Sequence, residues 1–70
     1  MYSYHQCITI GIYLFENRDI NEHVWHITAR FVIDRLNELR QQCTENQLIA
    51  MDDTIGFLES GICVKDKSIL

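Results

Sequence analysis

The chain has 70 residues, of which 47% are hydrophobic and 23% are charged, a composition typical of a folded globular protein. A chain of this length can form one domain at most, and domains this small often need a disulfide, a metal ion or a second copy of themselves for stability. Six Lys and Arg against ten Asp and Glu give a formal net charge of −4, which disfavours a nucleic-acid partner because phosphate backbones are bound through basic side chains.

Residues 3–16 form the first expected element, and two patterns compete for its secondary structure. Ser3 followed by Gln6 has the spacing of a capping box, which favours a helix. The competing pattern is a strict alternation of apolar residues that is typical of a strand: Ile8, Ile10, Ile12 and Leu14. We expect a helix over residues 7–15, with the strand as the alternative. In either form the segment is apolar on most sides and should be buried.

A long amphipathic helix is predicted over residues 19–43, with Asp19 as its N-cap. Its main apolar stripe repeats at helical spacing and consists of Trp25, Ala29, Val32, Leu36, Leu39 and Cys43. A second stripe lies about 100° round the helix and consists of Ile20, Val24, Ile27 and Phe31. Because the second stripe stops halfway, the first half of this helix needs two packing partners and the second half needs one.

A further helix is predicted over residues 45–60, where Thr44 and Gln47 form a second capping-box pattern. Its single apolar seam consists of Leu48, Met51, Ile55, Leu58 and Ile62. This seam is one residue out of phase with the main stripe of the long helix, which indicates a turn and antiparallel packing. Gly61 is placed to end the helix, and residues 61–70 then form a tail.

These elements predict an all-α fold in which residues 1–70 form one small domain: a short N-terminal helix, or a strand, followed by an antiparallel helical hairpin. The helix over residues 45–60 can cover only one stripe of the long helix, and the N-terminal segment can cover part of the other. The remaining apolar surface predicts a homodimer. We expect the surface for a partner or a second copy to comprise Tyr13, Ile20, Val24, Trp25, Ile27 and Phe31.

The residues that could carry chemistry do not form a complete site. His23 and His26 share a helical face, but a stable metal site needs further ligands that only another element could supply. Cys7, Cys43 and Cys63 are an odd set without a close pair, which favours reduced thiols and a cytoplasmic protein. No glycine-rich phosphate loop is present, and no apolar run reaches the about 18 residues of a membrane span. We therefore expect no enzymatic activity, cofactor, metal or membrane contact.

The function predicted from these features is a non-enzymatic protein–protein interaction module, a small regulator, adaptor or inhibitor that binds a larger protein. The aromatic and aliphatic residues on the first half of the long helix are typical anchors of such interfaces. The alternative is a small dimeric DNA-binding transcription regulator, in which residues 8–15 form an intermolecular ribbon followed by two helices. That ribbon would contain no Lys or Arg to contact phosphate, which favours the first hypothesis.

Overall fold

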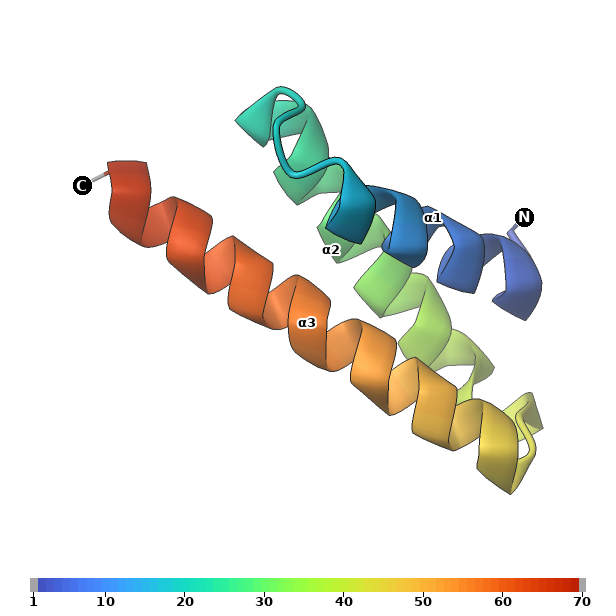
Figure 1. The fold of residues 1–70 in the computed structure, drawn as a ribbon. Coiled ribbons are helices and arrows are strands. Elements are labelled where there is room, and N and C mark those ends of the chain that lie inside the picture. The colour runs from blue at the N-terminus through green and yellow to red at the C-terminus, as the bar shows by residue number, and fades with distance from the viewer. Residues whose placement is uncertain (1, 70) are drawn as a thin grey trace.

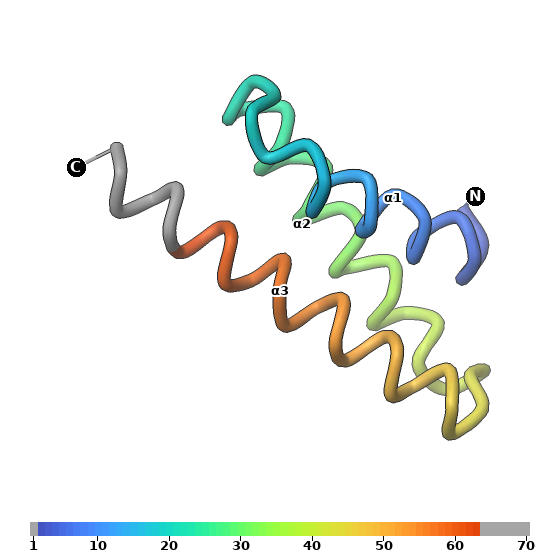
Figure 2. Tube along the Cα trace, viewed as in Figure 1, coloured from blue at the N-terminus to red at the C-terminus, as the bar shows by residue number. Residues whose placement is uncertain are grey.

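The computed structural model describes the backbone of residues 2–69 and the side chains of residues 2–63. Within this part the chain forms the α-helices α1 (Tyr4–Glu16), α2 (Glu22–Leu39) and α3 (Glu45–Ile69), with a 3₁₀ turn, η1 (Arg40–Gln42), between α2 and α3. Each helix packs against the other two (Figure 1). Figure 2 shows that the chain reverses direction at both connections, so that α1 and α3 each run antiparallel to α2. The expected all-α fold of three packed helices is confirmed.

The first helix begins at the predicted capping box. The Ser3 hydroxyl oxygen accepts from the Gln6 backbone N–H at 3.3 Å, and the Gln6 side-chain oxygen accepts from the Ser3 backbone N–H at 2.8 Å. These two bonds satisfy backbone donors that a helix start otherwise leaves unpaired. Residues 7–15, for which helix and strand patterns compete, all lie in α1. The helix buries Cys7, Gly11 and Leu14 on one face. The expected burial of the whole segment is wrong, because this helix also leaves large apolar side chains 48–54% exposed: Ile12, Tyr13 and Phe15.

The second helix begins later than predicted. Its N-cap is Asn21 rather than Asp19, and the Asn21 side-chain oxygen accepts from the backbone N–H groups of His23 at 2.9 Å and Val24 at 3.2 Å. Ile20 consequently lies in the connection before α2. The helix also ends earlier, at Leu39, where η1 tightens the last turn. Asp and Asn are about equally good N-caps, so local propensity did not distinguish the two positions.

This cap can be tested directly. Replacing Asn21 by alanine removes both side-chain bonds and should lower the free energy of unfolding by about 1 kcal/mol. The matched change Asp19→Ala should alter it by less than about 0.5 kcal/mol, because the structure gives Asp19 no capping role. Urea unfolding followed by far-UV circular dichroism measures both variants. Equal destabilisation by the two changes would contradict the observed start of α2.

The third helix is longer than predicted. It starts as expected, with the Thr44 and Gln47 pair forming both bonds of a capping box at 2.8 Å and 3.3 Å. It does not end at Gly61, however, and continues through the expected tail to Ile69, while Leu70 lies outside the described residues. Gly61 lies inside α3 and contributes to packing rather than to helix termination. A Cβ atom there would collide with the Trp25 ring, including its Cζ2 atom at 2.9 Å.

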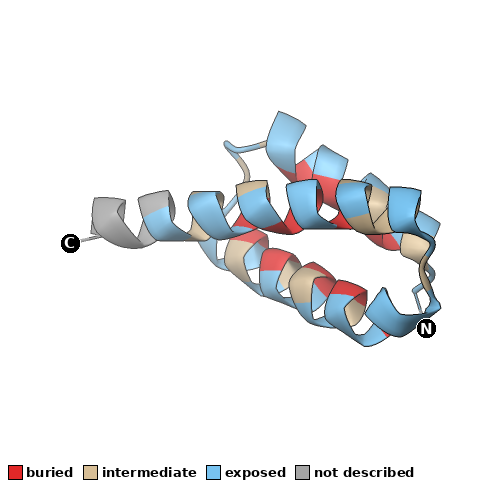
Figure 3. Ribbon diagram, turned by 90° about the horizontal axis from the view of Figure 1, so that it is seen from below, coloured by how far each residue is buried: buried red, intermediate tan, exposed pale blue. Residues whose placement is uncertain are grey.

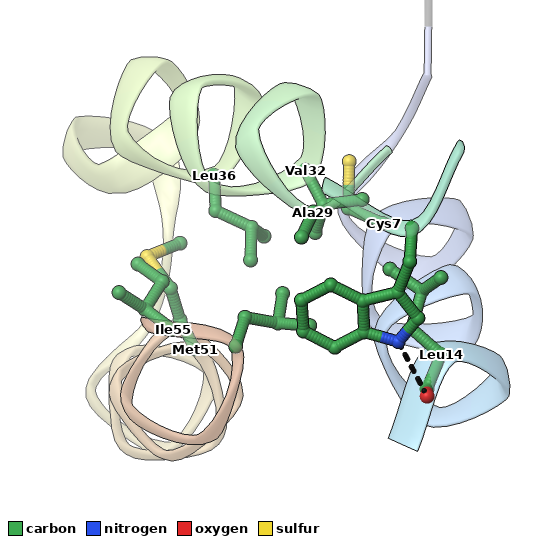
Figure 4. Packing of buried hydrophobic residues seen from close by; sticks show 9 residues of the cluster. Cys7, Leu14, Ala29, Val32, Leu36, Met51 and Ile55 are labelled. Carbon is green, nitrogen blue, oxygen red and sulfur yellow. Dashed lines mark hydrogen bonds between the residues drawn. The ribbon is translucent and has the colours of Figure 1, made fainter. Parts of the chain in front are cut away.

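The core lies between the three helices, where their apolar stripes converge (Figure 3). The main stripe of α2 is buried as predicted, at Trp25, Ala29, Val32, Leu36 and Leu39, with Cys43 half-buried beyond it. The seam of α3 buries Met51, Ile55 and Leu58 and half-buries Leu48 and Ile62. Figure 4 shows the labelled side chains of α2 and α3 pointing toward one another, with Cys7 and Leu14 of α1 beside them.

Candidate functional site

The second stripe of α2 remains at the surface of the subunit. Val24 is 52% exposed, Ile27 56% and Phe31 43%. Their spacing of three and four residues places them on one line along the helix. We refer to Val24, Ile27 and Phe31 as the α2 stripe. Single exposed apolar residues are common on protein surfaces, but three large ones in a row form a continuous apolar strip.

The other predicted interface residues lie in different places. Tyr13 is 54% exposed on α1, and Ile20 is half-buried against the core from the connection between α1 and α2. Trp25 is only 2% exposed, and its indole N–H donates to the Leu14 backbone oxygen at 3.0 Å, the dashed line in Figure 4. Trp25 therefore belongs to the core and not to the exposed surface. Of the two aromatic residues on the first half of α2, only Phe31 faces outward.

One residue that the sequence did not place at this surface extends it. The Tyr2 ring lies 5.2 Å from the Phe31 ring, centroid to centroid, with an edge-to-face angle of 80°. The Arg35 Nε–H donates to the Tyr2 backbone oxygen at 2.9 Å, and Arg35 also pairs with Glu38 at 3.0 Å. The start of the chain is thereby held against α2. The sequence contains three tyrosines among its first thirteen residues, but the side to which each tyrosine side chain points depends on how α1 packs against α2.

The surroundings of the α2 stripe are polar. His23, Arg30 and Asp34 are exposed on the same helix. The Thr28 hydroxyl is already bonded to the Val24 backbone oxygen at 2.7 Å. An apolar centre with a charged and polar rim is the usual organisation of a protein–protein interface.

The histidines and cysteines are the candidates for chemistry in this chain. Within the described part of the chain no group of three His, Cys, Asp or Glu residues could hold a metal ion. His23 and His26 share α2, where a ring nitrogen of His26 lies 2.9 Å from the Glu22 backbone oxygen. Burial raises the pKa of the Cys7 thiol above its ordinary 9.0, although the charge of Arg35 opposes this shift. A raised thiol pKa is the opposite of what nucleophilic catalysis needs.

The raised pKa of Cys7 predicts a loss of stability in alkali. The folded protein holds the thiol proton more tightly than the unfolded chain does, so this contribution is complete below pH 9.0 and disappears as the pH rises through the folded-state pKa. The free energy of unfolding should therefore fall more steeply with pH for the native chain than for Cys7→Ala once the pH exceeds 9.0, by at most about 1.4 kcal/mol per pH unit. Urea titrations at stepped pH measure this. Parallel curves would contradict the prediction.

The described helices include none with the combined length and apolar character needed to cross a membrane. Comparisons of the chain with protein-family models, with curated proteins and with solved structures find no significant match.

Proposed function

We propose that the chain is a non-enzymatic protein-interaction module, a small regulator, adaptor or inhibitor that forms a homodimer and binds a larger protein through the α2 stripe. The observation that carries the proposal is the exposure of Val24, Ile27 and Phe31, which stay 43–56% exposed on a helix whose main apolar stripe is buried. Covering apolar area stabilises a complex by about 25 cal/mol per Å² before the losses of association are subtracted. Phe31, supported edge-on by Tyr2, has the rigid aromatic character of an interface anchor.

The size of the chain supports self-association in particular. A 70-residue domain buries only about 60% of its unfolded surface and gains little stability from its own core. A second copy covering the α2 stripe adds apolar burial at a surface that one subunit leaves exposed, and a larger partner would compete with that copy for the stripe.

The DNA-binding alternative receives less support. Its layout needs residues 8–15 as an intermolecular strand, and these residues lie in α1. The α1 sequence also contains no Lys or Arg to contact phosphate.

The proposal is tested by placing a charge in the α2 stripe. Ile27→Glu should raise the dissociation constant of the homodimer by about 30-fold or more, equivalent to about 2 kcal/mol, because a carboxylate would have to be desolvated at the interface. Ile49→Glu is the matched control, since Ile49 is also a helical isoleucine and is 59% exposed on α3. Sedimentation velocity over a concentration series measures both variants.

A native chain that stays monomeric at high micromolar concentration would refute the homodimer, and equal weakening by both variants would refute the position of the interface. The larger partner is tested with the same two variants as baits in affinity capture from the native host. We expect a protein that the native chain and Ile49→Glu retain and Ile27→Glu loses. Retention by all three baits would exclude the α2 stripe as its binding surface.

A further inference from the structure

A groove separate from the α2 stripe opens between the end of α1 and the second half of α3. Its volume is about 540 Å³, and it is lined by Phe15, Arg18, Trp25, Gly56, Phe57, Ser60 and Gly61. Sites for small organic ligands have volumes of about 300–1,000 Å³ and are mostly apolar with a few polar groups. The groove has this size and this composition.

Aromatic rings form the walls of the groove. The Phe15 and Phe57 rings lie 5.2 Å apart, centroid to centroid, at an angle of 61°. The Trp25 ring belongs to the core, and its bond to the Leu14 backbone oxygen holds the indole in place. Rings at such an angle can contact a further aromatic ring through their faces and through their edges. Such contacts stabilise an aromatic pair beyond the burial of its apolar area.

Two of the residues that line the groove, Gly56 and Gly61 of α3, have no side chain. Gly61 is required by packing, because a Cβ atom there would collide with Trp25. Gly56 is different, since a Cβ atom there would have no neighbour within 4 Å. A glycine inside a helix lowers its stability by about 1 kcal/mol relative to alanine. Packing within the subunit therefore does not explain Gly56, and the absence of a side chain there adds open space to the groove.

Arg18 is the one ionisable residue among the described residues that line the groove. Its guanidinium carbon lies 4.6 Å from the centroid of the Phe15 ring, a cation–π distance that places the charge over an aromatic wall. A guanidinium has five N–H donors and can donate to a carboxylate in addition to its other contacts. A positive group beside aromatic rings is complementary to a ligand that is aromatic and anionic.

We propose that this groove binds a small aromatic carboxylate, with its ring against Phe15, Phe57 and Trp25 and its carboxylate on Arg18. The site goes beyond the proposed interaction function, because it shares no residue with the α2 stripe. It makes the protein a binder of a small molecule as well as of other proteins.

The probe for this test is 2-naphthoate, titrated into the full chain. Isothermal titration calorimetry measures the affinity and the stoichiometry, because the naphthalene ring absorbs and emits light in the same range as the single tryptophan, Trp25. We expect saturable binding at one site per chain. The neutral analogue 2-naphthalenemethanol should bind about tenfold more weakly, because it cannot form the charged contact with Arg18.

Two pairs of variants distinguish the effect of the Arg18 charge from the effect of the open space beside Gly56. Arg18→Gln should weaken 2-naphthoate binding about tenfold and leave the neutral analogue unchanged, whereas Arg30→Gln, a matched change on the exposed face of α2, should alter neither. Gly56→Leu should weaken both compounds about tenfold or more by filling the groove, whereas Gly56→Ala should retain them within about threefold. Circular dichroism confirms that each variant is folded.

The proposal is overturned if the titration with 2-naphthoate does not reach saturation at one site per chain. It is also overturned if Arg18→Gln and Arg30→Gln have the same affinity for 2-naphthoate, or if Gly56→Leu has the affinity of the native chain. Decanoate binding more tightly than 2-naphthoate would also overturn it, since that would identify an aliphatic site. Ile27→Glu should bind 2-naphthoate normally, so that failure of the groove and failure of the α2 stripe give different results.

Discussion

Replacing Leu36 by alanine should lower the free energy of unfolding by about 2–5 kcal/mol, the largest effect that we expect from a conservative change in α2. Leu36 is fully buried and lies in the cluster that joins all three helices. Removing three carbon atoms there forfeits their transfer free energy and leaves a cavity that packed neighbours fill only in part. A single core in a chain this short rarely supplies more than about 3–5 kcal/mol, so Leu36→Ala should be largely unfolded at 25 °C.

The control for this prediction is Ile49→Ala. Both changes remove an aliphatic side chain from a helix, but Ile49 is 59% exposed, so its loss should alter the free energy of unfolding by less than about 0.5 kcal/mol. Urea unfolding followed by far-UV circular dichroism measures both. If the two variants were equally stable, Leu36 could not occupy the centre of the core.

Two glycines of the same helix should respond in opposite directions to the same substitution. Gly56→Ala should raise the free energy of unfolding by about 0.5–1 kcal/mol, because alanine favours the helix and the added methyl group meets no atom within 4 Å. Gly61→Ala should lower it by about 1–3 kcal/mol, because the methyl group would displace the Trp25 ring, which lies in the core and is bonded to Leu14.

Thermal and urea unfolding measure this difference, and Trp25 fluorescence provides a second readout. The emission should change in folded Gly61→Ala, where the indole must move, and remain as in the native chain in Gly56→Ala. Stabilisation by both substitutions would show that Gly61 is not packed against Trp25 and that α3 does not run straight past this ring.

The sequence predicts the helices well where the information is local. Both capping boxes join residues three positions apart, and both are formed as expected at Ser3 and Thr44. The main stripe of α2 follows from helical periodicity alone, and each of its residues from Trp25 to Leu39 is buried. The half-length second stripe also led to an apolar surface on the first half of α2, where Val24, Ile27 and Phe31 are exposed.

The sequence failed where two local solutions are nearly equal in free energy. Asp19 and Asn21 are both good N-caps, and the helix begins after Asn21. Gly61 has the position of a helix terminator, yet the approach of a ring 36 positions earlier in the chain gives it a packing role within α3. Trp25 lies on the main stripe but was also expected at the partner surface, and its 2% exposure and its bond to the Leu14 carbonyl place it in the core alone.

What the amino-acid sequence determined by itself is therefore the buried faces of α2 and α3 and the starts of α1 and α3, because caps and periodicity act over three or four residues. It left residues 7–15 open between helix and strand. The tertiary structure alone decided that the Trp25 indole bonds to the Leu14 carbonyl and that Phe15, Arg18 and Phe57 meet at one groove. The physical reason is that these outcomes depend on contacts between residues far apart in the chain. Such contacts contribute to stability only after α1 has packed against both α2 and α3.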